Sequence, residues 1–224
     1  MDKRFLAILA GVVIILGGIF VVAKNSDSGG SGGSNSSNAQ PTNHLIGKGQ
    51  AGVTLLEYGD FQCPVCAIYY APLKQVTDIY QNEIYFQFRN LPLTSIHQNA
   101  FAAARAAEAA DKQGKYWEMY GKLYENQTAW SSSSTALGLF KGYAKAIGLD
   151  ESKFEKDYAS EEINDAINAD VAAFGKTGQQ QSTPSFFINS KPISNSEFTD
   201  SSGSPSVEAM SATIDKAIAE QKAQ

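Results

Sequence analysis

The chain has 224 residues, of which 43% are hydrophobic, and it carries a formal net charge of −5 at pH 7. This length and apolar content fit one folded domain with extensions, or at most two small domains. An acidic chain without a basic stripe is poorly suited to binding nucleic acid, so no nucleic-acid partner is expected.

The N-terminal segment predicts a membrane anchor. Residues 5–23 contain no charged side chain; the basic pair Lys3 and Arg4 precedes them and Lys24 follows. A helix of this length spans about 28 Å, close to the thickness of a bilayer core. The apolar region of a cleaved signal is usually shorter, about 7–15 residues, so residues 1–24 are interpreted as a signal anchor, with cleavage as the alternative. The basic pair predicts that the rest of the chain lies outside the cytoplasm.

Residues 25–43 predict a flexible linker. They consist mainly of Ser, Gly and Asn, so they cannot bury enough apolar surface to fold. As a random coil they would span about 24 Å. The folded domain is therefore expected over residues 44–224, free to tumble near the membrane without a fixed orientation.

A Cys-x-x-Cys sequence follows the first predicted strand, which covers residues 53–58. This motif, where a strand leads into a helix, is typical of a dithiol–disulfide redox centre. Pro64 suits the first helical position, where its missing N–H costs nothing. Cys63 then takes the N-cap, where unpaired N–H groups and the helix dipole favour a thiolate. Cys63 is therefore predicted to be the attacking sulfur, and Cys66 the shielded sulfur that resolves the mixed disulfide.

The sequence has no other cysteine, which limits the alternative interpretations of the motif. A structural zinc site needs about four ligands, and the distant His44 and His97 do not complete a convincing set. A purely structural disulfide that closes so short a loop would add little stability. The redox interpretation is favoured, and neither a metal nor another cofactor is expected.

The remaining predicted elements are two strands and a series of helices. Alternating apolar residues at 84–88 predict a second strand, and a third is predicted at residues 185–188. Thr183 and Pro184 stand directly before this third strand, where proline is unusual because it cannot donate to the sheet ladder. Helices are predicted from composition, caps and apolar spacing at residues 99–112, 116–126 and 135–147, around 154–158, and at 161–174 and 207–223.

Three segments, in this order, resemble the DsbA-like thiol:disulfide oxidoreductases, a branch of the thioredoxin fold. They read EYGDFQCPVC at residues 57–66, NLPL through GKYWEM within residues 90–119, and TPSFFIN at residues 183–189. The resemblance covers roughly residues 45–220. It implies an α/β fold with a thioredoxin-like mixed sheet of four or five strands, and a helical domain inserted at about residues 97–178.

The resemblance also implies a substrate-binding surface around the cysteines. Pro184 is expected to form a cis peptide bond and to face the two sulfurs. The backbone of Thr183 would then offer strand-like hydrogen bonds to a substrate segment. Pro64 and Val65, which lie between the cysteines, are expected to contact the same substrate.

Glu57 matches a buried acidic residue beneath the active site of the family, and it is the expected proton acceptor for Cys66. The alternative is a surface carboxylate at the end of a strand. His97 and Trp117 also match family positions, and both are interpreted as packing residues.

Two departures from the family pattern bear on the strength of the site. Val65 stands where the family usually has histidine, so no imidazolium lies beside Cys63, and its pKa is expected to be lowered only modestly. Polar residues at 179–182 replace a more apolar approach to Pro184. A milder oxidant with a more polar peptide-binding surface is therefore expected.

The predicted function is a membrane-tethered thiol:disulfide oxidoreductase on the periplasmic or extracellular side that oxidises secreted or membrane proteins through a Cys63–Cys66 disulfide. The resemblance implies a membrane redox partner that reoxidises this pair. A linker stands where related isomerases add a dimerisation domain, which favours a monomer. If the protein is another kind of enzyme, the alternative is a disulfide isomerase or reductase. If it is not an enzyme, the alternative is a chaperone-like peptide-binding module.

Overall fold

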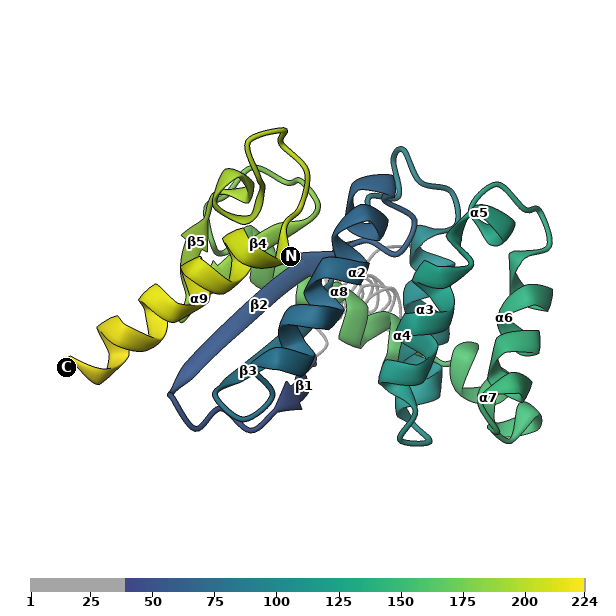
Figure 1. The fold of residues 1–224 in the computed structure, drawn as a ribbon. Helices are drawn as coiled ribbons and strands as arrows, with labels where there is room; N and C mark the ends of the chain where they lie inside the picture. Colours follow the sequence, from purple (N-terminus) through teal and green to yellow (C-terminus); the bar gives the residue numbers. More distant parts are fainter. Residues whose placement is uncertain (1–38, 224) are drawn as a thin grey trace, which may run out of the picture. The chain divides into compact units, whose positions relative to one another are not determined.

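The computed structural model describes residues 39–223, which fold into a β-sheet and the helices around it (Figure 1). The sheet has five strands in the order β1-β3-β2-β4-β5. β2 and β3 are parallel and the other neighbours are antiparallel, so the sheet is mixed, as expected. The strands are β1 (His44–Gly47), β2 (Val53–Gly59), β3 (Ile84–Asn90), β4 (Ser185–Ile188) and β5 (Lys191–Ile193).

Six helices, α3 to α8, lie between β3 and β4 in the chain and form the expected helical insertion (Figure 1). α3 is rich in alanine, and its small side chains allow α4, α7 and α8 to pack closely around it. The helices are α2 (Pro64–Ile79), α3 (Ala100–Asp111), α4 (Tyr116–Glu125), α5 (Gln127–Trp130), α6 (Ala136–Ala146), α7 (Glu151–Tyr158), α8 (Glu161–Gly175) and α9 (Val207–Lys222), with a short 3₁₀ helix η1 (Asn195–Phe198).

The central strand β2 is buried on both of its faces. Val53 and Leu55 contribute to the large core that α2, α4 and α9 also line. Leu56 and Tyr58 point the other way and pack with Phe174 of α8 in a smaller cluster. This alternation follows because successive side chains of a strand point to opposite faces of the sheet. The buried strand ends at Gly59, four residues before Cys63, and so fixes the position of the cysteine motif.

The predicted membrane anchor at residues 5–23 lies outside the described residues. Between residues 39 and 223, no helix is both long and apolar enough to cross a bilayer. The anchor, the signal alternative and the linker up to residue 38 therefore stay predictions.

The last residues of the predicted linker pack on the folded unit. Thr42 is buried, and Asp170 of α8 accepts hydrogen bonds from its backbone N–H and from its hydroxyl, both at 2.7 Å. Arg89 of β3 donates to the carbonyl of Thr42 at 3.2 Å. Asp170 is fully buried and needs such donors, which is why Thr42, within the predicted linker, packs against it.

His44 connects the edge strand β1 to the helical insertion. Its Nε2 lies 2.9 Å from Glu108 and its Nδ1 lies 3.4 Å from Asp111, both on α3. Its ring stacks on Tyr116 of α4, with the ring centroids 3.5 Å apart. Burial lowers the pKa of His44, but hydrogen bonds with Asp111 and Glu108 outweigh it and raise that pKa to about 9.

We expect His44→Gln to lower the free energy of unfolding by about 3 kcal/mol near pH 6, because the raised pKa of His44 stabilises the fold. The folded pKa lies above the unfolded value, so this contribution is full below about pH 6.5 and is lost as pH rises through about 9. Urea melts of both proteins at pH 6 and pH 10 measure it. An unchanged gap between the two proteins at pH 10 would contradict the assignment.

Candidate active site

The two cysteines lie at the start of α2, just beyond the end of β2. Cys63 is the N-cap of α2, with extended backbone angles, and Pro64 follows in the first turn. The backbone N–H of Cys63 donates to the carbonyl of Asp60 at 3.0 Å, which closes the turn between strand and helix. The predicted N-cap placement of Cys63 is therefore confirmed. Both cysteines are free thiols in this structure.

The loop before β4 lies directly against Cys63. The Thr183–Pro184 peptide bond is cis, as expected from the resemblance. The Sγ of Cys63 lies 3.4 Å from the carbonyl oxygen of Thr183, to which it can donate as a thiol, although the two residues are 120 positions apart in the sequence. Pro184 is buried and Thr183 is half-buried. The fold thus brings together Cys63, Thr183 and Pro184, three of the predicted site residues.

The pKa of Cys63 is lowered from its ordinary value of 9.0 to about 5. The largest cause is a hydrogen bond from the Cys66 thiol; burial opposes it, and a side-chain hydrogen bond from Thr183 and the backbone N–H groups of Cys66 and Val65 add to it. The expectation of a modest shift is wrong, because these donors compensate for the missing imidazolium at position 65. At neutral pH Cys63 is a thiolate.

Cys66 has the opposite character. It is 1% exposed, against 5% for Cys63. Burial raises the pKa of Cys66 well above its ordinary value, and the hydrogen bond it gives to Cys63 has the same effect. One sulfur of the pair is therefore a stabilised thiolate and the other a shielded thiol, which is the division of roles predicted from the sequence.

Glu57 lies on β2 beneath the cysteines and is 1% exposed. Neither of its carboxyl oxygens has a hydrogen-bond partner within reach among the described residues. Burial raises the pKa of Glu57 to about 8, and the nearby Cys63 thiolate adds to this effect. The surface-carboxylate alternative is therefore wrong. A buried carboxyl with a pKa near neutrality suits proton exchange with a buried thiol.

The residues between the cysteines form part of an exposed apolar surface. Pro64 is exposed, Val65 is 45% exposed, and Ile68, one turn further along α2, is 60% exposed. Residues 179–182, on the other side of Cys63, are polar and exposed. Pro64 and Val65 are therefore accessible beside Cys63, and their contact with a substrate stays a prediction.

Two residues that hold the cysteine turn were not identified from the sequence. The buried Asp60 accepts hydrogen bonds from the backbone of Gln62 and of Leu93, at 2.7 and 2.9 Å. The Nδ1 of His97 lies 2.6 Å from Oδ2 of the same side chain, so His97 also holds Asp60 in place instead of only packing. Gln127 of α5 donates to the carbonyls of residues 61 and 63 at 2.7 and 3.0 Å. Asp60 lies within the quoted motif and could have been noticed; Gln127 gives no local signal.

A possible metal-ligand set lies away from the cysteines. His44, Glu108 and Asp111 bring their ligand atoms within 4.8 Å of one another. Both ring nitrogens of His44 already face these carboxylates, and the raised pKa favours the protonated ring, so the set is better described as an ion-pair cluster.

We expect Thr183→Val to raise the pKa of Cys63 by about one unit, or about 1.4 kcal/mol, because it removes a buried hydroxyl that acts to lower this pKa and has no other hydrogen-bond partner among the described residues. Valine keeps the shape of threonine, so the loop should hold its place. Thiolate absorbance at 240 nm, followed against pH, measures the change. Ser182→Ala is the control, because its hydroxyl contacts Gln180 and Ser185 instead. Equal titrations of the two variants would count against the role of Thr183.

A family model described as thioredoxin matches residues 39–216. Among solved structures, a thioredoxin-like oxidoreductase from Silicibacter pomeroyi DSS-3 is 25% identical, with a TM-score of 0.60, and the match covers 83% of this chain and 98% of that one. BdbD from Bacillus subtilis is 24% identical, with a TM-score of 0.66, over 80% of this chain and 96% of that one. The resemblance to DsbA-like proteins is thus confirmed at the level of the fold.

Curated proteins that are similar in sequence are named as ion antiporters and not as oxidoreductases. A protein named Na(+)/H(+) antiporter NhaA 1 from Salinispora arenicola is 34% identical over 176 residues, which are 79% of this chain and 25% of that protein. A second protein of this name, from Mycolicibacterium gilvum, is 34% identical over 160 residues, or 66% of this chain and 23% of its own. The chain thus spans about a quarter of the length of these relatives, and their whole-protein activity is not carried over to it.

Proposed function

Because the chain belongs to the thioredoxin family and has its DsbA-like fold, we propose that it is a thiol–disulfide oxidoreductase that donates a Cys63–Cys66 disulfide to other proteins. The observation that carries this proposal is the pairing of a Cys63 thiolate, at the N-cap of α2, with a buried Cys66 thiol. The N-terminus of a helix stabilises the negative charge on Cys63 when its bond to the substrate breaks and the oxidised substrate is released.

The exchange proceeds in two displacements. A substrate thiolate attacks the Sγ of Cys63, the bond between the two enzyme sulfurs breaks, and its electron pair goes to Cys66. A second substrate thiolate then attacks the substrate sulfur of the mixed disulfide, and Cys63 leaves as a thiolate. Two electrons pass from the substrate to the enzyme, and a disulfide forms in the substrate.

Glu57 supplies the proton for the first displacement. Cys66 leaves as a thiolate inside the core, where burial disfavours its charge. With a pKa of about 8, Glu57 is protonated at neutral pH and can give its proton to this sulfur. Reoxidation runs the transfer in reverse, with Glu57 as the acceptor.

The low pKa of Cys63 favours an oxidase over a reductase. A more stable Cys63 thiolate makes the reduced enzyme more stable, so its disulfide is given away more readily. Equilibration with glutathione buffers tests this, and we expect a reduction potential above about −180 mV, the value typical of disulfide isomerases. A value near −270 mV, typical of thioredoxin, would favour the reductase alternative.

The location and partners form a further part of the proposal. Residues 5–23 would anchor the domain, and an extracytoplasmic position would give it an oxidising compartment and cysteine-containing clients. A membrane redox partner that accepts two electrons would reoxidise the monomeric enzyme. Salt-resistant recovery with membranes tests the anchor; a soluble mature chain that begins near Lys24 would overturn it.

A chaperone-like module is kept as a second candidate because Val65 and Ile68 expose an apolar surface next to the site. Replacing both cysteines by alanine separates the two functions. Client binding that survives this change, together with a wild-type protein that has no exchange activity, would favour the chaperone.

A further inference from the structure

Glu57 needs a route by which its proton exchanges with solvent. The charged and titratable groups that act on it are Cys63 and Cys66 of α2, and the hydroxyls of Tyr120 and Tyr124 of α4. Glu57 is 1% exposed and closely enclosed, since a Cβ placed on Gly59 would lie only 2.9 Å from its Oε1. A carboxyl enclosed in this way can renew its proton only through one of the neighbouring hydroxyls or sulfurs.

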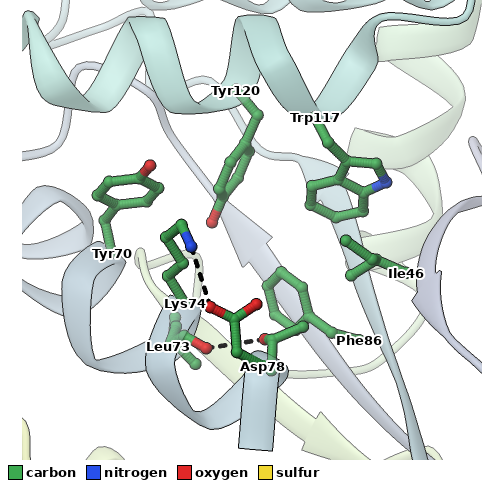
Figure 2. A pocket seen from close by; sticks show the side chains of 9 residues that line it. Ile46, Tyr70, Leu73, Lys74, Asp78, Phe86, Trp117 and Tyr120 are labelled. Atoms are coloured by element: carbon green, nitrogen blue, oxygen red, sulfur yellow. Dashed lines mark hydrogen bonds and ion pairs between the residues drawn. The ribbon is translucent and has the colours of Figure 1, made fainter. Parts of the chain in front are cut away.

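A cavity of about 120 Å³ lies between α2 and α4, beside β1 and β3. Tyr120 forms part of its wall, and Figure 2 shows the hydroxyl of Tyr120 directed into the cavity, toward Lys74. Lys74 and Asp78 form an ion pair of 3.0 Å, and their side chains are 60% and 67% exposed. The far side of the cavity is therefore in contact with solvent.

Tyr120 thus faces two environments. The Tyr120 hydroxyl acts to lower the pKa of Glu57, although no hydrogen bond joins the two side chains in this conformation. Proton transfer between them therefore needs a small side-chain rotation, or one water between them. Tyr124, one turn along α4, also acts on Glu57, but its hydroxyl is fully buried without a partner and does not line the cavity.

We propose that the Tyr120 hydroxyl relays protons between the cavity and the Glu57 carboxyl, so that Glu57 can serve Cys66 repeatedly. The inference rests on the proposed function. After Glu57 gives its proton to the Cys66 thiolate, Tyr120 passes its own hydroxyl proton to the Glu57 carboxylate and takes one from water. One proton moves from solvent to Cys66, and no electron is transferred. Burial raises the pKa of Tyr120 well above its ordinary value, which disfavours a tyrosinate. The hydroxyl therefore accepts a proton from water in the same step in which it gives its own proton to Glu57.

The test compares Tyr120→Phe with the matched control Tyr124→Phe. Each change removes one hydroxyl next to Glu57 and keeps the ring packing of α4. In repeated turnover of a dithiol peptide at pH 6–7, with glutathione disulfide as the oxidant, we expect Tyr120→Phe to lower the rate about tenfold and Tyr124→Phe to change it less than twofold. The first turnover should be equal in both variants, because Glu57 starts with its proton. The difference should vanish above about pH 8, where Glu57 is ionised in both proteins.

A second pair of variants leaves Tyr120 in place. Ile46 lies on the cavity wall, whereas Leu45 does not, and both are partly exposed on β1. Ile46→Trp should fill the cavity mouth and slow the same turnover, and Leu45→Trp should not. This pair keeps the inference testable if the tyrosine variants fold poorly.

An equilibrium measurement checks the contact without any turnover. A carboxyl-carbon NMR titration should show a higher pKa for Glu57 in Tyr120→Phe than in wild type, because the hydroxyl that acts to lower this pKa is lost. Equal titrations and equal rates for the two tyrosine variants would overturn the relay while leaving the proposed function intact. A wild-type protein without exchange activity would overturn both.

Discussion

Cys63→Ser is expected to reduce thiol–disulfide exchange to the uncatalysed background. Cys63 carries the lowered pKa and stands at the N-cap of α2, whereas Cys66 is enclosed in the core, so no other thiol of the chain can replace it. Turnover of reduced insulin or of a scrambled disulfide substrate measures the loss. Far-ultraviolet circular dichroism should be unchanged, because serine fits the same position.

Cys66→Ser is the informative counterpart. Substrate attack on Cys63 can still give a mixed disulfide, but the enzyme then has no second sulfur to resolve it. Covalent complexes should accumulate, and mass spectrometry should locate their bond at Cys63. Complexes joined through Cys66 in the Cys63→Ser protein would reverse the assignment of the two sulfurs.

The reduced protein is expected to be more stable than the oxidised protein by about 3 kcal/mol at pH 7. The pKa of Cys63 is lowered from 9.0 to about 5, so at pH 7 the folded reduced form is ionised while the unfolded chain is not. The pH then lies about two units above the folded pKa, and each unit contributes about 1.4 kcal/mol of stability. The oxidised form has no thiol to ionise, and a disulfide across so short a loop adds little.

The sign of this effect gives it a characteristic pH profile. A lowered pKa adds stability that is fully present above the unfolded value of about 9 and is lost as pH falls through about 5. Above about pH 9 the gap should shrink, because Cys66 ionises in the unfolded chain while its raised pKa keeps the buried thiol protonated in the folded reduced form. Paired guanidinium melts of the two redox forms at pH 4, 7 and 9 measure it. A more stable oxidised form at pH 7 would mean that the disulfide is kept, and the oxidase proposal would fail.

The centre of the site could be predicted because its signals are local. Cys63, Pro64 and Cys66 define a helix start within four positions, and the β-branched and aromatic strand residues around them identify β2 and β3. The cis bond before β4 was available only through the resemblance. The size of the shift in the pKa of Cys63 could not be read from the motif, since it depends on how the folded turn aims the Cys66 thiol and the backbone N–H groups at Cys63, and also on Thr183, 120 positions away.

The missing elements are short and depend on distant partners. β1, β5, η1 and the single-turn helix α5 contain three or four residues each, too few for a periodic signal. β1 is fixed by pairing with β3 and by His44, whose partners lie on α3. Gln127 acts on the cysteine turn from α5, across 64 positions. Such contacts are created by the fold and leave no pattern in the surrounding sequence.

The two hydrogen bonds between Thr42 and Asp170 determine which contacts of the domain would bear a pulling force applied to the chain before it. A pull on the chain before residue 39 reaches Asp170 on α8, and then β1 and β3, before it can reach α2. Asp170 also accepts a hydrogen bond from the backbone of Asn90, so the strain is shared between the insertion and the sheet. Tension applied at this end should therefore first break the hydrogen bonds between Thr42 and Asp170 and the pairing of β1 with β3, while the turn that contains Cys63 keeps its geometry.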